Sequence, residues 1–334
     1  MSGEGVESDT GNALQIIIAG AGTMGHGLAL LMAKAGHEVL LMDIDEGILD
    51  RAIKLIEAHL SSFVEAGQLD TNMISEIVGR IRTTTELSAI KTQDIIIESV
   101  PEDQDIKRSF YEKVAILCSA ETIVASNTSY LDVFSLAPAF IQERLIITHF
   151  FEPPYLIPLV EVVKGPQTNP EVIQKMRKIL LKAGQRPIIM EKFIPGFVVN
   201  RLQRAMGREI FHLIDGGFVK PEEIDKAVLA SLGVRIPVLG VVRRYDFAGL
   251  DLALKVLSNP SIGLMDKDTV SPTLKGLVAQ GYTGVKAGKG FYDYHGQNVE
   301  QIYEKRDRLL MRMREVIEEI EKVMWQNPQA YEKT

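Results

Sequence analysis

The chain has 334 residues, of which 46% are hydrophobic, which is enough for two globular domains. Its formal net charge of −7 offers no basic surface for nucleic acid, because phosphate binding depends on clustered Lys and Arg. Cys118 is the single cysteine and cannot form an internal disulfide. The sequence carries neither a signal-peptide pattern nor an apolar run long enough to cross a membrane, so we expect a cytoplasmic protein.

A glycine-rich turn follows the first apolar run, residues 14–19. Its three glycines allow in turn a tight bend, a close approach of the backbone to a pyrophosphate, and packing of the next helix against the strand. A second apolar run leads to Asp43, whose carboxylate would accept hydrogen bonds from the adenosine ribose and repel a 2′-phosphate. The spacing therefore predicts NAD rather than NADP. The residues of this predicted turn are Gly20, Gly22, Thr23, Met24 and Gly25.

Short apolar runs alternate with helical patterns through the first half of the chain, which is typical of a parallel, doubly wound sheet. Residues 46–82 have helical spacing throughout and predict a helical hairpin that turns near Gly67. After residue 193 the pattern is helical, apart from one expected strand at residues 291–292. The other expected strands are residues 14–19, 39–42, 95–100, 123–126, 145–148, 159–163 and 186–190.

We therefore predict an α/β fold: a Rossmann-type doubly wound sheet with a helical hairpin insert, followed by an all-helical C-terminal domain. The second domain would bind substrate and form a homodimer, because exposed amphipathic helices need a partner surface for their apolar faces. The expected segments are a disordered tail at 1–12, the NAD-binding domain at 13–192, the helical domain at 193–295, and a C-terminal stretch at 296–334 that is helical from 298 to 325.

His149 is the histidine best placed for chemistry, because it closes an expected parallel strand at the end where such sheets bind ligands. Glu161 follows 12 residues later inside an apolar run, where an acid is costly without a partner. A carboxylate bonded to one imidazole nitrogen fixes the tautomer and leaves the other nitrogen to accept a proton. The pair is either a general-base dyad or a buried structural pair. We expect surface or packing roles for the other five histidines.

Four motifs, in this order, resemble the signatures of the L-3-hydroxyacyl-CoA dehydrogenase family. They are S-N-T-S at 126–129, H-F-F-E-P at 149–153, L-V-E-V-V at 159–163 and P-G-F-V-V-N-R at 195–201. The resemblance runs from residue 14 to about residue 294 and implies that His149 is the general base and Glu161 its orienting partner. It also implies that Ser126 and Asn200 hold the substrate oxygen, although a turn former and a helix-start residue are the plainer interpretations.

The same resemblance implies contacts with the nicotinamide half of NAD. Glu102 and Lys107 match the pair that makes these contacts, Lys286 matches a lysine near the cofactor, and Ser126 and Glu152 lie in matching motifs. The two lysines could instead be solvated surface charges.

Three positions depart from the acyl-CoA members, and they concern the substrate. His59 and the turn at 66–67 stand where those members carry a Ser and a Lys that hold CoA. Glu152 replaces a neutral amide near the nicotinamide. Arg235 stands where members that act on free acids tend to have a basic residue, and a guanidinium suits a carboxylate. Arg243 or Arg244 could serve instead, and each could equally be a surface or interface arginine.

These observations predict an NAD-dependent oxidoreductase of fatty acid metabolism that needs no metal and uses His149 to oxidise a 3-hydroxyacyl substrate, with a 3-hydroxyacyl-CoA as the first candidate. A free 3-hydroxy acid, such as gulonate or a carnitine-like compound, is almost equally well supported. A non-catalytic, crystallin-like NAD-binding protein is the alternative from another class. The lysine-based β-hydroxyacid dehydrogenases share the glycine turn but not the spacing of His149 and Glu161.

Overall fold

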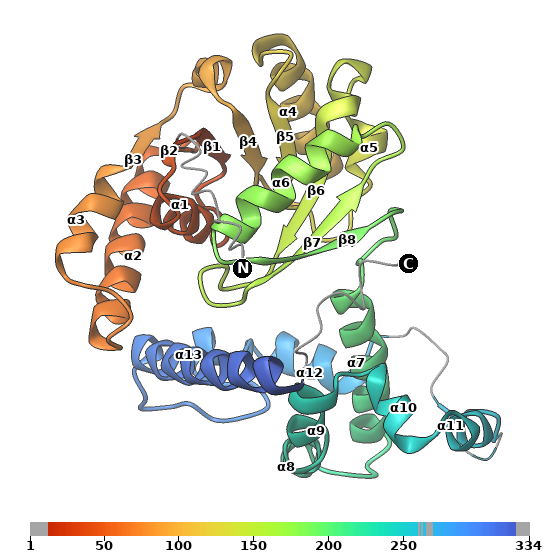
Figure 1. Ribbon diagram of the computed structural model, residues 1–334. Helices are drawn as coiled ribbons and strands as arrows, with labels where there is room; N and C mark the ends of the chain where they lie inside the picture. The colour runs from red at the N-terminus through yellow and green to blue at the C-terminus, as the bar shows by residue number, and fades with distance from the viewer. Residues whose placement is uncertain (1–12, 260, 262, 265–269, 325–334) are drawn as a thin grey trace, which may run out of the picture. The chain divides into compact units, whose positions relative to one another are not determined.

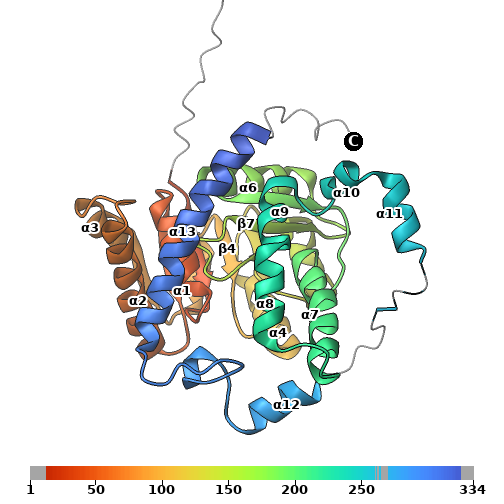
Figure 2. The same ribbon diagram turned by 90° about the horizontal axis from the view of Figure 1, so that it is seen from below.

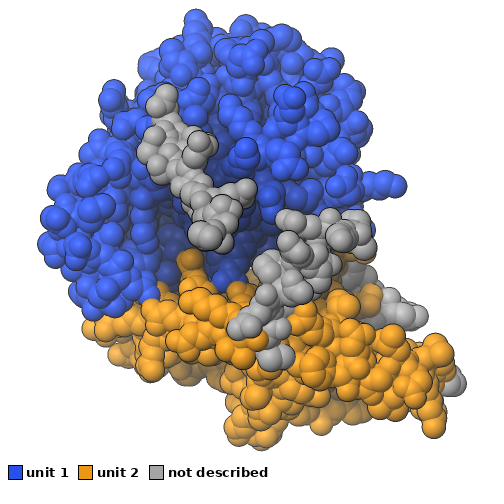
Figure 3. All heavy atoms as spheres, in the orientation of Figure 1, with its two compact units in different colours: residues 1–200 blue, residues 201–334 orange. Residues whose placement is uncertain are grey.

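The computed structural model describes residues 13–324 except 260, 262 and 265–269, so the predicted tail at 1–12 lies outside the described residues. The chain divides into two compact units, residues 1–200 and 201–334 (Figure 3). Within the described residues, no helix is long and apolar enough to cross a membrane.

An eight-stranded sheet forms the centre of the first unit, with the order β3-β2-β1-β4-β5-β6-β7-β8 (Figure 1). Every neighbouring pair is parallel except β6 and β7, which are antiparallel. This arrangement confirms the predicted doubly wound sheet. The strands are β1 (Gln15–Ala19), β2 (Glu38–Met42), β3 (Ile81–Thr84), β4 (Ile95–Glu98), β5 (Ile123–Ser126), β6 (Leu145–Phe150), β7 (Leu159–Lys164) and β8 (Arg186–Met190).

Several helices of the first unit begin at a capping side chain. Asp45, Asp103 and Asn169 each accept a backbone N–H of the helix that follows, which satisfies donors that a helix start leaves unpaired. The predicted hairpin is confirmed, with Gly67 at φ +70° after its first helix. The helices are α1 (Gly25–Lys34), α2 (Glu46–Glu65), α3 (Asn72–Gly79), α4 (Gln104–Leu117), α5 (Val133–Leu136) and α6 (Pro170–Lys182), with short 3₁₀ turns at η1 (Leu87–Thr92) and η2 (Ala139–Arg144).

Three details of the strand prediction are wrong. Strand β3 lies at the sheet edge and begins inside the segment that we predicted to be helical throughout. The sequence did not reveal it because only Ile81 of its four residues is buried. Residues 291–292 form no named strand; nearby, Lys289 makes isolated bridges to Gly284 and Asp293. Strand β6 runs to Phe150, so His149 lies within the strand rather than after it.

The second unit is helical as predicted, and α7 and α8 lie side by side in it (Figure 2). None of the described helices α7 to α12 contains a residue that is fully buried. Large apolar side chains instead remain exposed, among them Leu254 at 70% and Leu257 at 73%. The helices are α7 (Val199–Asp215), which begins at the end of the first unit, α8 (Pro221–Ala230), α9 (Leu232–Leu239), α10 (Arg243–Ala248), α11 (Leu250–Leu257), α12 (Pro272–Ala279) and α13 (Val299–Met324), with a 3₁₀ turn at η3 (Val285–Ala287).

Candidate active site

The strand register brings the predicted catalytic side chains to one face of the sheet. Glu98 pairs with Ser126 across β4 and β5, and Ser126 pairs with Ile147 of β6. His149, two residues beyond Ile147, points to the same face because side chains alternate along a strand. Glu161 of β7 lies directly opposite His149 in the antiparallel pair. The sheet therefore presents an acid, a serine, a histidine and a second acid together.

His149 and Glu161 form a buried hydrogen-bonded pair. The Nδ1 atom of His149 lies 2.8 Å from Oε2 of Glu161, and the two residues are 4% and 0% exposed. The other oxygen of Glu161 accepts the backbone N–H groups of Val198 at 2.9 Å and Val199 at 3.0 Å, where α7 begins. These contacts offset the cost of burying the acid and hold the imidazole in a single orientation.

Two phenylalanines surround the imidazole of His149. The ring of Phe151 lies 4.6 Å and that of Phe197 5.2 Å from it, measured between centroids. Phe197 is buried in the left-handed conformation at φ +52°, which is uncommon for a residue with a side chain. Among the described residues, none hydrogen-bonds to Nε2 of His149, so this nitrogen is the one that can take a proton. Sequence reasoning missed both phenylalanines, although each belongs to a quoted motif.

The glycine turn has the geometry that the sequence predicted. Gly20 adopts φ +100°, and a Cβ at this position would lie 2.4 Å from the carbonyl oxygen of Ser99. A Cβ on Gly25 would lie 1.7 Å from the carbonyl oxygen of Gly20, whereas one on Gly22 would meet nothing within 4 Å. The first and third glycines are therefore required by the fold, and the second leaves the backbone open to a phosphate.

Asp43 stands at the end of β2, beside the glycine turn. Its Oδ2 accepts the backbone N–H of Ala21 at 2.8 Å, and its Oδ1 accepts that of Ile44 at 2.8 Å. The carboxylate thus links the second strand to the turn, at the position where the fold places the adenosine ribose.

Glu102 and Lys107 form a partly buried ion pair at 3.2 Å. Lys107 is fully buried, which excludes the solvated surface charge that was the alternative for this residue. Glu102 also accepts hydrogen bonds from the hydroxyl of Thr128 and the backbone N–H groups of Ser129 and Tyr130. Burial opposes its ionisation, but these bonds and the Lys107 charge together hold the pKa of Glu102 below its ordinary value.

Glu98 is the site residue that sequence reasoning missed. It is fully buried at the end of β4, and its carboxylate lies 2.6 Å from each of three side-chain atoms: Nζ of Lys107, the hydroxyl of Tyr111 and Oγ of Ser126. The signal was present in the sequence, because an acid that ends the apolar run I-I-I-E needs a partner just as Glu161 does.

Asn127 has a structural part in the site. Its Oδ1 accepts the backbone N–H of Phe150 at 2.9 Å, and its own N–H donates to the carbonyl of Glu98. The side chain therefore connects the end of β5 to the end of β6, one residue after His149.

Packed aromatic rings surround His59, which stands where the acyl-CoA members carry a residue that holds CoA. His59 stacks on His26 with centroids 5.5 Å apart, and the hydroxyl of Tyr155 lies 3.1 Å from Nδ1 of His59. Burial lowers the pKa of His26, although its hydrogen bond to Gly22 and the charge of Glu152 oppose this shift.

The remaining predicted site residues lie at the start of α7 and in the second unit. Asn200 is the second residue of α7, directly after Val199, whose N–H contacts Glu161. Arg235 is an exposed residue of α9, and its Nε donates to the carbonyl of Ser231 at 3.4 Å. Lys286 belongs to η3. The roles of Asn200, Arg235 and Lys286 at the substrate or cofactor stay predictions.

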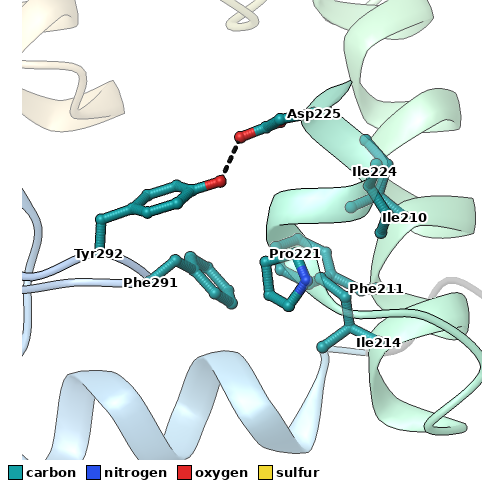
Figure 4. A pocket seen from close by; sticks show the side chains of 8 residues that line it. All are labelled: Ile210, Phe211, Ile214, Pro221, Ile224, Asp225, Phe291 and Tyr292. Atoms are coloured by element: carbon teal, nitrogen blue, oxygen red, sulfur yellow. Dashed lines mark hydrogen bonds between the residues drawn. The ribbon is translucent and has the colours of Figure 1, made fainter. Parts of the chain in front are cut away.

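The second unit has an apolar pocket of its own between α7 and α8 (Figure 4). The hydroxyl of Tyr292 donates to Asp225 there, which raises the pKa of Tyr292 to about 12. The pocket contains none of the predicted site residues. It is lined by Ile210, Phe211, Ile214, Pro221, Ile224, Asp225, Phe291 and Tyr292.

A Rossmann-type sheet, an NAD-type glycine turn and a buried His–Glu pair together define an NAD-dependent dehydrogenase. The family models agree: residues 15–193 match the NAD binding domain of 3-hydroxyacyl-CoA dehydrogenase, and residues 196–294 match its C-terminal domain. The chain belongs to the 3-hydroxyacyl-CoA dehydrogenase family, and NAD is its cofactor.

Some of the similar proteins are named for a CoA thioester substrate and others for a substrate without CoA. The chain is 32% identical over 305 residues to a 5-formyl-3-hydroxy-2-methylpyridine 4-carboxylate 5-dehydrogenase of Mesorhizobium japonicum, covering 91% of this chain and 98% of the relative. It is 36% identical over 279 residues to a probable 3-hydroxybutyryl-CoA dehydrogenase of Deinococcus radiodurans, covering 83% and 99%.

Solved structures show the same two groups. A crystal structure of a 5-formyl-3-hydroxy-2-methylpyridine 4-carboxylic acid 5-dehydrogenase has a TM-score of 0.82 at 30% identity, covering 92% of this chain and 99% of that one. An (S)-3-hydroxybutyryl-CoA dehydrogenase from Ralstonia eutropha has a TM-score of 0.68 at 28% identity, covering 85% and 99%.

Proposed function

We propose that this protein oxidises the 3-hydroxyl of a 3-hydroxyacyl substrate with NAD, and that His149 is the general base. The buried His149–Glu161 pair carries this proposal, because it leaves Nε2 of His149 as the proton acceptor. The substrate hydroxyl gives its proton to Nε2 while the carbinol carbon becomes a carbonyl. When bound, NAD accepts the hydride from that carbon. Glu161 stabilises the resulting imidazolium.

The remaining site residues bind and orient the reactants in this proposal. The glycine turn holds the pyrophosphate, and Asp43 holds the adenosine ribose. Ser126 and Asn200 contact the substrate oxygen. For the nicotinamide half of the cofactor we propose contacts from four further residues: Glu102, Lys107, Glu152 and Lys286.

A CoA thioester is the first candidate substrate, because the family and two of the four relatives named above are 3-hydroxyacyl-CoA or 3-hydroxybutyryl-CoA dehydrogenases by name. A free 3-hydroxy acid is the second candidate. Two observations favour it: His59 is engaged with Tyr155 where CoA-binding members would hold CoA, and the structure with the TM-score of 0.82 belongs to a dehydrogenase of a pyridine carboxylate. Arg235 would then bind the carboxylate.

Oxidation of NADH with acetoacetyl-CoA and with a panel of free 3-keto acids decides between these substrates. Turnover of the thioester alone supports the CoA candidate, and turnover of a free acid alone supports the second. Tight NADH binding without turnover of any compound would contradict the proposed activity and favour a non-catalytic NAD-binding protein.

We also propose that the protein is cytoplasmic and forms a homodimer through its second unit. The large apolar side chains that α11 exposes, including Leu250, Leu254 and Leu257, support the dimer, because apolar faces of this size are normally covered by a partner. Light scattering that gives the mass of one chain at micromolar concentration would contradict it. The free, buried Cys118 is compatible with a reducing compartment.

A further inference from the structure

His26 lies beside the glycine turn as the second residue of α1, and only 8% of it is exposed. Its Nδ1 atom lies 2.9 Å from the carbonyl oxygen of Gly22. A carbonyl oxygen can only accept a hydrogen bond, so Nδ1 of His26 must carry the hydrogen. The imidazole therefore donates to the backbone of the turn whether it is neutral or protonated.

Gly22 is the glycine that leaves room for a phosphate, and its backbone is weakly restrained for the same reason. It has no side chain to pack, and glycine loses more conformational freedom on folding than any other residue. The main-chain hydrogen bond to its carbonyl, from the N–H of His26, is long at 3.3 Å. The imidazole supplies the shorter of these two hydrogen bonds, so the side chain of His26 holds the carbonyl in place.

The carbonyl of Gly22 shares a planar peptide unit with the N–H of Thr23. In a trans peptide the two groups point in opposite directions, so a fixed carbonyl fixes the N–H as well. At the start of a helix the N–H groups point back toward the N-terminus, where phosphates bind. Among the described residues, none accepts the N–H of Thr23, and no side chain caps α1. This N–H is therefore left to a ligand.

The imidazole of His26 is itself held by a ring of α2. The ring of His59 stacks on it with an interplanar angle of 19°. Burial between packed elements and this stacking restrict rotation of the imidazole, so its Nδ1 atom stays directed at Gly22.

We propose that His26 is a positioning residue for the pyrophosphate of NAD: its Nδ1–H holds the Gly22–Thr23 peptide so that the Thr23 N–H is directed at a phosphate oxygen. The inference goes beyond the proposed function, because it concerns the cofactor and makes no use of the substrate or of His149. It gives His26 a role beyond the surface or packing role that the sequence predicted.

Two substitutions separate the hydrogen bond from the packing of the ring. His26→Phe keeps a ring that can stack on His59 but has no N–H to donate. His26→Asn loses the ring but places an amide NH₂ close to the position of Nδ1. If the hydrogen bond positions the turn, His26→Phe weakens NAD binding more than His26→Asn does. If only ring packing matters, the order is the reverse.

Calorimetric titration measures the Kd of NAD, and displacement of NADH measures the Kd of adenosine, which carries no phosphate. In His26→Phe the Kd of NAD should rise about tenfold, the size of one hydrogen bond. The Kd of adenosine should change by less than about twofold, because adenosine does not reach the turn through a phosphate. In His26→Asn both constants should stay within about twofold of the wild-type values.

The wild-type chain provides a further test without substitution. Because burial lowers the pKa of His26 below its ordinary value of 6.5, the imidazole is neutral at about pH 8. A ¹⁵N NMR spectrum at this pH should show the hydrogen on Nδ1 of His26, with the signal assigned by its loss in His26→Asn.

Four outcomes overturn the proposal: an unchanged Kd of NAD in His26→Phe, equal weakening of NAD and adenosine, greater weakening of NAD in His26→Asn than in His26→Phe, or a hydrogen on Nε2 of the neutral wild-type ring. None of them bears on the proposed oxidation, which turnover assays test separately. If circular dichroism shows His26→Phe to be unfolded, His26→Leu, which also lacks a donor and is close to histidine in size, replaces it.

Discussion

The two units of the chain differ in how completely they bury their apolar side chains and pair their buried polar ones. In the first unit the buried acids Glu98 and Glu161 have hydrogen-bond partners on both oxygens, and the central strands are buried. In the second unit no described helix from α7 to α12 has a fully buried residue. The first unit buries its core and pairs its buried acids by itself, whereas the second unit needs another surface to cover its apolar side chains.

The largest effect should come from the base in the first unit. His149→Gln removes the proton acceptor, so turnover should fall by about two to four orders of magnitude while NAD affinity stays close to the wild-type value. Stopped-flow kinetics and NADH fluorescence titration measure the two quantities. His295→Gln, an exposed residue of the second unit, is the matched control and should leave both unchanged. A His149→Gln enzyme with wild-type turnover would contradict the proposed mechanism.

The glycine turn allows a sharper test with two matched substitutions. Gly25→Ala places a methyl group against the Gly20 carbonyl and should lower the free energy of unfolding by about 3 kcal/mol. Gly22→Ala meets nothing within 4 Å, so the protein without NAD should keep its stability and lose about tenfold or more in NAD affinity. Urea unfolding and calorimetric titration measure these changes. Equal destabilisation by the two substitutions would contradict the separate roles of the glycines.

In the second unit, Leu254→Glu/Leu257→Glu should weaken the dimer without unfolding the chain, because both side chains are exposed within one unit. We expect the dissociation constant to rise about tenfold or more, since a charge would enter an apolar interface. Sedimentation velocity across a concentration series measures it, with Lys255→Gln on the same helix as control. An unchanged dissociation constant would place the interface elsewhere.

The smallest expected effect is a dependence of stability on pH. Burial lowers the folded-state pKa of His26, so below the ordinary value of 6.5 the unfolded chain binds more protons than the folded one. The free energy of unfolding should therefore fall as the pH drops through and below 6.5. Urea unfolding at several pH values should show a shallower dependence in His26→Gln, and an identical slope would contradict the assignment.

Periodicity and motif spacing predicted most of the first unit, because buried strands and glycine turns impose strong local patterns. The edge strand β3 was not predicted, because one buried residue in four leaves no alternation of buried and exposed residues to detect. The sequence also predicted that His149 and Glu161 meet, but it could not show that Val198 and Val199 complete the Glu161 carboxylate. That contact depends on where the chain returns after β8, which no local pattern records.

Glu98 was missed for a different reason. Its partners lie 9, 13 and 28 residues away on α4 and β5, and their convergence depends on strand register. The rule that a buried acid needs a partner applies to it as it does to Glu161. Such acids at strand ends deserve the same weight as histidines when a sequence is searched for a site.

The hydrogen bond from the Phe150 backbone to Asn127 has a consequence for protein engineering. This hydrogen bond holds the backbone of β6 immediately after His149, so the length of the side chain at position 127 sets the position of the imidazole. A shorter or longer residue there would shift the imidazole without touching it. A library that varies position 127 would therefore tune proton transfer by moving the imidazole, while leaving the chemical identity of each reacting group unchanged.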